Sequence, residues 1–254
     1  MRNKKAYQTK SNYSKTLNRK VTFYFYSTLK DNEAGPLLIM QDGQNLFDDA
    51  IAAYGTSWGF IEALNQPGVP KMRVLGISNA GSFEGRCAEY SPFVRRSIKE
   101  EGINTPTGGH GDRYLKYLMK EVLPLYRSKY PTTKVYMGGS SLGGLITLAA
   151  ILKYPNELEG GFGLSNAFWY AEKPLLKRVE RFEGILPRFY LDIGSEESSD
   201  PRINQLYEKS HERFAALLAE KTNKGVKEAL IEGGKHHESD WAKRLSDVLS
   251  WLIK

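Results

Sequence analysis

Short runs of apolar and β-branched residues, each bounded by turn-forming residues, recur along the whole chain. Runs of this length and composition are typical of β-strands. In the first of them, VTFYFYS, the alternation around Tyr24 and Tyr26 indicates an antiparallel strand with one solvated face. The predicted strands are 21–27, 37–40, 73–77, 134–137, 161–164, 189–193 and 226–231.

Segments with helical spacing of apolar residues lie between these strands. The predicted helices are 58–64, 114–129, 142–154, 174–179, 203–221 and 241–253. Pro124 interrupts the second of them near its end. One apolar stripe on that helix is predicted from Tyr114, Leu115, Leu118, Val122 and Leu125.

The alternation of strands and helices predicts an α/β fold. We expect a mostly parallel central sheet with helices on both faces and an antiparallel N-terminal part. No repeat, low-complexity tract or composition shift marks a boundary, so residues 1–254 are predicted to form a single domain. Segment 78–111 is dense in glycine, proline and charge, which predicts an irregular segment above the carboxyl ends of the strands.

Composition adds that the chain can bury a sizeable core, since 41% of its 254 residues are hydrophobic. Its net charge of +7 comes from residues 1–20, which hold seven of the 36 basic residues and no acidic one. The other 29 basic residues balance 29 carboxylates. A basic arm is more often a solvated edge than a nucleic-acid tail, and no nucleic-acid motif is present, so we expect no nucleic-acid partner.

Cys87 is the only cysteine, which excludes an intramolecular disulfide and a cysteine-based zinc site. The N-terminal segment has no apolar core of a signal peptide, and the longest apolar run, 145–152, is too short to cross a bilayer. We therefore expect a cytoplasmic protein with no membrane partner.

The glycine-rich stretch MGGSSLGG, at 137–144, stands between a predicted strand and a predicted helix. It contains the G-x-S-x-G pattern of a nucleophile elbow, with Ser141 as the candidate nucleophile. Gly139 and Gly143 fit this pattern because the sharp turn leaves no room for side chains at those positions. A phosphate-binding loop is the alternative, but neither G-x-x-x-x-G-K-[ST] nor G-x-G-x-x-G is present.

A serine nucleophile needs a histidine base and an acid that orients the histidine. Of the four histidines, His110 lies in the irregular segment and His211 in a predicted helix. His236 and His237 lie in a loop after the last predicted strand, where such a base is expected. A metal site formed with Glu238 and Asp240 is the weaker interpretation, because adjacent histidine side chains point apart.

The acid is expected at the carboxyl end of strand 189–193. Asp192 alternates with core residues inside the strand, which makes it the weaker candidate. Glu196 and Glu197 follow the strand, and the residues alone do not decide which of the two is the acid. The oxyanion that forms on attack needs two N–H donors, one of them from Leu142. The loop after strand 37–40 supplies the other, from Gly43, Gln44 or Asn45.

Several further motifs occur in the same order as in one known family of enzymes. They are MQDGQNLFDD at 40–49, SWG at 57–59, GRCAEYSPF at 85–93, EVLPLY at 121–126, GGSSLGGL at 138–145, LSNAFWY at 164–170 and GGKHHESDW at 233–241. Through nearly its whole length the chain resembles the esterase family of esterase D, enterochelin esterase and feruloyl esterase, a branch of the α/β-hydrolases.

The resemblance implies Ser141 as the nucleophile, and His236 as the base because Trp241 follows it by five residues. It also implies Glu197 as the acid of the catalytic triad and Gln44, with Leu142, as an oxyanion donor. Two residues are expected to contact the substrate, namely Gly43 and Trp169.

Aromatic residues and one charged pair near these motifs have two interpretations each. Trp169 and Phe168 follow a strand end and either line the substrate pocket or are simply packed in the core. Arg86 and Glu89 are expected to form an ion pair that fixes their loop, with contact to the substrate as the alternative.

The implied activity is that of a serine esterase, a hydrolase that cleaves a small-molecule ester with a small or medium acyl group. No cofactor and no metal are needed for it. An acyltransferase that uses the same acyl-serine and a non-catalytic binding protein with a hydrolase fold are the alternatives. The sequence is compatible with a monomer and with a homo-oligomer.

Overall fold

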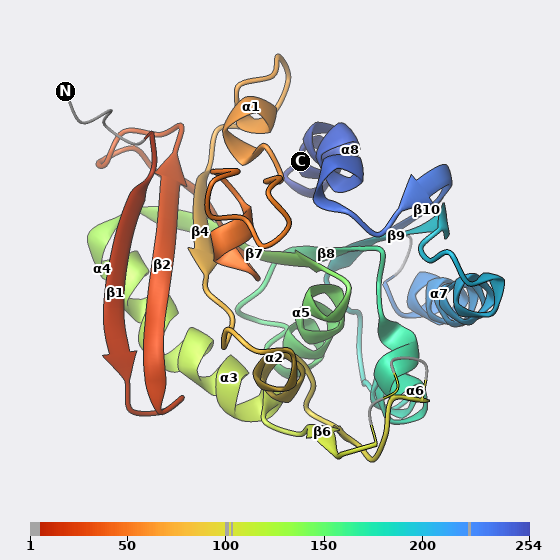
Figure 1. Cartoon of the computed structure of the whole chain (residues 1–254). Coiled ribbons are helices and arrows are strands. Elements are labelled where there is room, and N and C mark those ends of the chain that lie inside the picture. Colours follow the sequence, from red (N-terminus) through yellow and green to blue (C-terminus); the bar gives the residue numbers. More distant parts are fainter. Residues whose placement is uncertain (1–5, 100–101, 103, 223–224) are drawn as a thin grey trace.

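An eight-stranded sheet forms the centre of the computed structural model, which describes residues 6–99, 102, 104–222 and 225–254 (Figure 1). Its strand order is β1-β2-β4-β3-β7-β8-β9-β10. The six strands from β4 to β10 in this order are parallel, whereas β1 pairs antiparallel with β2, and β2 with β4. The bounds are β1 Gln8–Ser14, β2 Arg19–Ser27, β3 Gly35–Met40, β4 Arg73–Ile77, β7 Thr132–Ser140, β8 Gly160–Leu164, β9 Arg188–Glu196 and β10 Val226–Lys235.

All seven predicted strands are present, and the prediction of a mostly parallel α/β fold with an antiparallel N-terminal part is confirmed. The prediction missed β1, whose sequence QTKSNYS has no apolar alternation because six of its seven residues are exposed at the sheet edge. Lys10 lies in this strand, as expected for a solvated basic edge. Arg2, Lys4 and Lys5 lie outside the described residues.

Helices cover both faces of the sheet (Figure 1). Helices α1 and α8 lie on one face, and α2 to α7 lie on the other. Their bounds are α1 Phe60–Leu64, α2 Phe83–Tyr90, α3 Gly111–Tyr117, α4 Leu123–Lys129, α5 Leu142–Lys153, α6 Glu172–Glu180, α7 Pro201–Lys221 and α8 Glu238–Leu252. Because side chains alternate along a strand, Leu37 and Ile39 of β3 enter one core while Leu38 and Met40 enter the other.

The predicted helix 114–129 is present but its register changes within it. A π-helical turn, Leu118–Val122, separates α3 from α4, and the Leu123 N–H donates to the Leu118 carbonyl. This wide turn comes directly before Pro124, which has no N–H to donate. It rotates the following residues, so that Leu123 is buried and Leu125 is 51% exposed. Including Leu125 in the apolar stripe was therefore wrong.

Segment 78–111 is more regular than predicted. It contains α2, whose first turn is capped by Ser82 through a hydrogen bond from the Gly85 N–H. It also contains two short paired strands, β5 Val94–Arg95 and β6 Thr107–Gly108. Between residues 79 and 98 this segment lines a cavity at the carboxyl ends of the parallel strands.

Two further observations on the described part of the chain concern its helices and its cysteine. None of its helices is both long and apolar enough to span a bilayer. Cys87 is a fully buried thiol.

Candidate active site

The turn between β7 and α5 holds Ser141 in a strained backbone conformation, with φ 56° and ψ −122°. The strand ends at Ser140 and the helix begins at Leu142, so one residue makes the whole reversal. A side chain on Gly139 would put its Cβ 2.8 Å from the backbone carbon of Gly143. The turn therefore requires glycine where the G-x-S-x-G pattern has it.

The Nδ1 atom of His236 lies 2.6 Å from Oε2 of Glu197. The Glu197 side chain is fully buried, and its Oε1 accepts a 2.5 Å hydrogen bond from the Gly194 N–H. Glu196 is exposed, and its carboxylate lies 4.0 Å from the Lys235 ammonium. Of the two glutamates that the sequence left open, Glu197 is the one that contacts His236.

Neighbouring parallel strands bring His236 and Glu197 together. Glu196 at the end of β9 lies opposite Lys235 at the end of β10, so the residues that follow each strand are adjacent. Two aromatic rings contact the imidazole of His236. Trp241 meets it edge-on at 5.3 Å between ring centroids, and Tyr207 of α7 does so at 5.6 Å.

The loop after β3 forms a short 3-10 turn, η1, at Gly43–Asn45. Gly43 is buried against β4, where a Cβ would lie 2.5 Å from the backbone of Gly76. Gln44 is the half-buried residue of this turn and lines the cavity. Leu142 also lines it, and as the first residue of α5 its N–H has no acceptor within the helix.

A cavity of about 760 Å³ joins these residues. Its lining includes six of the predicted site residues, namely Ser141, His236, Glu197, Gln44, Leu142 and Trp169. Gly43 is not part of the lining. Phe168 is fully buried and packs on Phe214 at 4.5 Å between ring centroids, so of the two aromatic candidates only Trp169 reaches the cavity.

The other candidate bases and acids have partners elsewhere. His110 is exposed and pairs with Arg113 at 3.1 Å, and His211 is buried on α7. Asp192 forms an ion pair with Arg244 at 2.6 Å and accepts a hydrogen bond from the Ser165 N–H. None of these three candidates lines the cavity.

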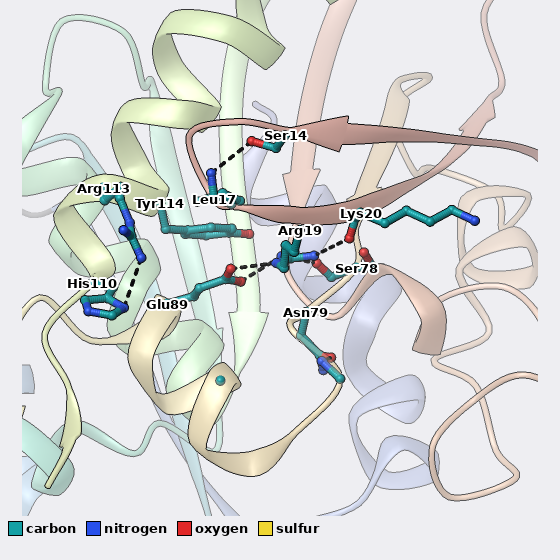
Figure 2. A network of polar contacts seen from close by, with 12 residues as sticks. Ser14, Leu17, Arg19, Lys20, Ser78, Asn79, Glu89, His110, Arg113 and Tyr114 are labelled. Atoms are coloured by element: carbon teal, nitrogen blue, oxygen red, sulfur yellow. Dashed lines mark hydrogen bonds and ion pairs between the residues drawn. The ribbon is translucent and has the colours of Figure 1, made fainter.

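The expected ion pair between Arg86 and Glu89 is wrong. Glu89 pairs with Arg19 of β2, and Figure 2 shows the two side chains joined through both carboxylate oxygens, at 2.6 and 2.7 Å. Arg86 instead pairs with Asp42, at 2.9 Å for both hydrogen bonds. The two charged side chains of α2 therefore reach different segments, Glu89 to β2 and Arg86 to the loop after β3.

The side chains that the sequence offered as metal ligands make other contacts. Nδ1 of His237 accepts from the Ser239 N–H at the start of α8, and Asp240 pairs with Lys243. Oε1 of Glu238 accepts from the Asn45 amide, and burial raises the pKa of this carboxyl. No group of three or more His, Cys, Asp or Glu side chains arranged to hold a metal ion occurs among the residues that the structure describes.

Two contributors to the cavity had no sequence signal of their own. Tyr207 belongs to the apolar side of a long helix, where an aromatic residue is usually part of the core. Asp42 stands beside the predicted oxyanion residues, yet its left-handed backbone, with φ 51°, is uncommon for a residue other than glycine.

Known proteins are similar to this chain along nearly its whole length, one in sequence and others in structure. The uncharacterized protein YbbA of Bacillus subtilis (strain 168) is 29% identical over 245 residues, which cover 92% of each chain. An IroE-like serine hydrolase from Shewanella oneidensis superposes with a TM-score of 0.77 at 21% identity, over 97% of this chain and 80% of that one. The siderophore hydrolase EstA from Aspergillus nidulans gives 0.74 at 16% identity, over 98% and 96%.

A family model described as "Putative esterase" matches residues 14–252. The match includes the β7–α5 turn, the His236 loop and the loop after β3, which agrees with the resemblance of the motifs. The chain therefore belongs to this esterase family, and its enzyme class is that of the carboxylic ester hydrolases with an α/β-hydrolase fold.

Proposed function

We propose that the protein is a serine carboxylester hydrolase with Ser141, His236 and Glu197 as its catalytic triad. The observation that carries the proposal is a strained serine in the same cavity as a histidine that is hydrogen-bonded to a buried glutamate. Because Nδ1 of His236 contacts a carboxylate, that nitrogen carries the proton and Nε2 keeps a lone pair. The lone pair can accept the proton of the Ser141 hydroxyl.

In this mechanism Ser141 Oγ attacks the ester carbonyl while His236 takes its proton. Glu197 stabilises the imidazolium, and the N–H groups of Leu142 and Gln44 bind the oxyanion. His236 then protonates the departing alcohol, which leaves an acyl-serine. Water activated by His236 hydrolyses the acyl-serine by the same route.

A small-molecule ester with a small or medium acyl group fits the proposal best. The cavity volume of about 760 Å³ lies within the usual range for small-molecule sites, which is roughly 300 to 1,000 Å³. Trp169 and Tyr207, whose rings meet at 5.5 Å, offer an apolar wall beside His236.

The test is Ser141→Ala, assayed with nitrophenyl acetate and butyrate. We expect kcat to fall by about 10⁵ to 10⁶-fold, as in other serine hydrolases that lose the nucleophile. A fluorophosphonate probe should label the parent protein and leave the variant unlabelled. Parent-like hydrolysis by the variant would contradict the proposal.

The same assays separate the two alternatives. Diversion of the acyl group to an added alcohol, at the expense of hydrolysis, would identify an acyltransferase. A parent protein that the probe fails to label would be a non-catalytic binding protein.

A further inference from the structure

One side chain, Arg86 of α2, contacts both segments that carry the proposed oxyanion donors. These segments are the loop after β3 and the β7–α5 turn. Its Nε and Nη2 atoms donate to Oδ1 and Oδ2 of Asp42, each at 2.9 Å. Nη2 also lies 3.5 Å from the carbonyl oxygen of Ser140. Asp42 is the residue before η1, which contains Gln44, and Ser140 is the residue before Ser141 and Leu142.

Several partners hold Asp42 in its conformation. Its left-handed backbone, with φ 51° and ψ 47°, is unfavourable for a residue with a Cβ. Its N–H donates to the buried Tyr90 hydroxyl at 2.9 Å, and its Oδ1 accepts from the Asn79 side-chain amide at 2.7 Å. These contacts and the guanidinium of Arg86 hold the residue from which η1 starts.

The Arg86–Asp42 pair is shielded from solvent, which strengthens its hold. The side chains of Arg86 and Asp42 are 22% and 8% exposed, and the guanidinium lies over the Tyr90 ring at 5.1 Å. Burial by itself lowers the pKa of Arg86, but the carboxylate of Asp42 more than offsets this, so the net pKa is raised and the guanidinium stays charged. Two parallel hydrogen bonds fix an orientation as well as a distance, which a lysine ammonium cannot do.

An oxyanion hole works only when both donors reach the same oxygen, at about 2.7 to 3.1 Å. The register of β3 against β7 aligns the strand ends, with Met40 opposite Gly138, and the Gln41 N–H still donates to the Gly138 carbonyl. Gln44 and Leu142 lie beyond these contacts between the two strands. We propose that the Arg86–Asp42 pair is a positioning device that sets the spacing between the Gln44 and Leu142 N–H groups. This inference rests on the proposed function.

The experiment compares Arg86→Gln, Arg86→Lys, Asp42→Asn and the Arg86→Gln/Asp42→Asn double variant. We expect each single variant to lower kcat for nitrophenyl acetate by about 10² to 10³-fold, the usual loss of one oxyanion donor, with little change in KM. Arg86→Lys should not restore kcat, because a lysine ammonium cannot form the two parallel hydrogen bonds to Asp42. The double variant should be no worse than either single one, since both remove the same interaction.

A trifluoromethyl ketone supplies a second readout, because its adduct with serine carries an oxyanion. Its inhibition constant should rise in the Arg86 and Asp42 variants by a factor similar to the loss in kcat. Asp42→Asn keeps the shape of the side chain, so it tests the proposal even if the Arg86 variants fold poorly.

Arg19→Gln is the matched control, since it breaks another part-buried bidentate pair, between Arg19 of β2 and Glu89 of α2. Arg19 contacts neither the loop after β3 nor the β7–α5 turn. It should lower Tm and leave kcat near the parent value. Arg86 variants that lower Tm but keep kcat and the ketone affinity would overturn the proposal. A rise in KM alone would also overturn it, because it would make Arg86 a substrate ligand. Ser141→Ala, run alongside, reports separately on the proposed function.

Discussion

The tandem Glu196-Glu197 shows how two chemically identical neighbours acquire different environments at the end of one strand. One carboxylate is exposed near Lys235, and the other is buried against His236. The difference comes from the pairing of β9 with β10, which fixes the side on which each residue lies. The sequence restricts the candidates for the acid to these two neighbouring glutamates. The choice between them depends on the register of β9 and β10, which are adjacent in the sheet but separated along the chain.

This difference predicts unequal effects of two conservative substitutions. Glu197→Gln should lower kcat by about 10⁴-fold, because the amide no longer stabilises the imidazolium of His236 or favours the useful tautomer. Glu196→Gln should leave kcat close to the parent value. Steady-state assays with nitrophenyl butyrate measure both, and equal losses would show that the assignment of the acid is incorrect.

The charged residues of α2 mark the limit of what neighbouring positions reveal. Arg86 and Glu89 are three residues apart, a spacing that suits a local ion pair on a helix. Their actual partners, Asp42 and Arg19, come from segments 44 and 70 residues away. Such pairs depend on which distant segments the fold brings near α2, so residue types and spacing cannot specify them.

At the scale of elements, hydrophobic periodicity was sufficient to predict the strands and helices whose apolar faces are buried. It gave the parallel strands and the long helices, because their apolar faces enter the two cores. It failed for β1, which is solvated, for α2, which is short and rich in polar residues, and for Leu125, which follows a π-helical turn. Each failure occurs where contacts between elements, or a change in helical register, override the local pattern.

The β7–α5 turn gives a prediction about an element junction. In Gly139→Ala the new Cβ would lie 2.8 Å from the Gly143 backbone and 3.0 Å from the Gln41 side chain. We expect the free energy of unfolding to fall by about 1 to 3 kcal/mol, as for other overpacked sites, and kcat to fall because Ser141 is displaced. Denaturant unfolding and nitrophenyl ester hydrolysis measure the two effects, and a variant with parent-like values would contradict the tight fit of the turn.

At the scale of the whole molecule, stability should depend on pH through a histidine outside the cavity. His211 is 5% exposed, and its Nε2 lies 3.5 Å from the Glu228 carboxylate. Burial lowers the pKa of His211 in the folded protein, in spite of the opposing effect of Glu228. The unfolded chain therefore binds a proton more readily, and the free energy of unfolding should fall as the pH drops below about 6.5.

The variant His211→Gln has no proton to gain at this position, which isolates the effect. We expect denaturant unfolding between about pH 7.5 and about pH 5 to show that the free energy of unfolding falls more for the parent than for the variant as the pH decreases. The limiting slope is about 1.4 kcal/mol per pH unit for one proton. Parallel pH profiles for the two proteins would rule out a contribution from His211.

The cavity lies at the carboxyl ends of the parallel strands, and this position affects how the substrate selectivity of the protein can change. Its walls come from loops that follow six different strands, whereas the two cores lie within the sheet and the helices. Exchanging a wall such as the segment around Tyr54, which is 72% exposed, would alter the shape presented to an ester without disturbing either core. Substrate selectivity can therefore change without a change of fold, both in natural divergence and by loop grafting in the laboratory.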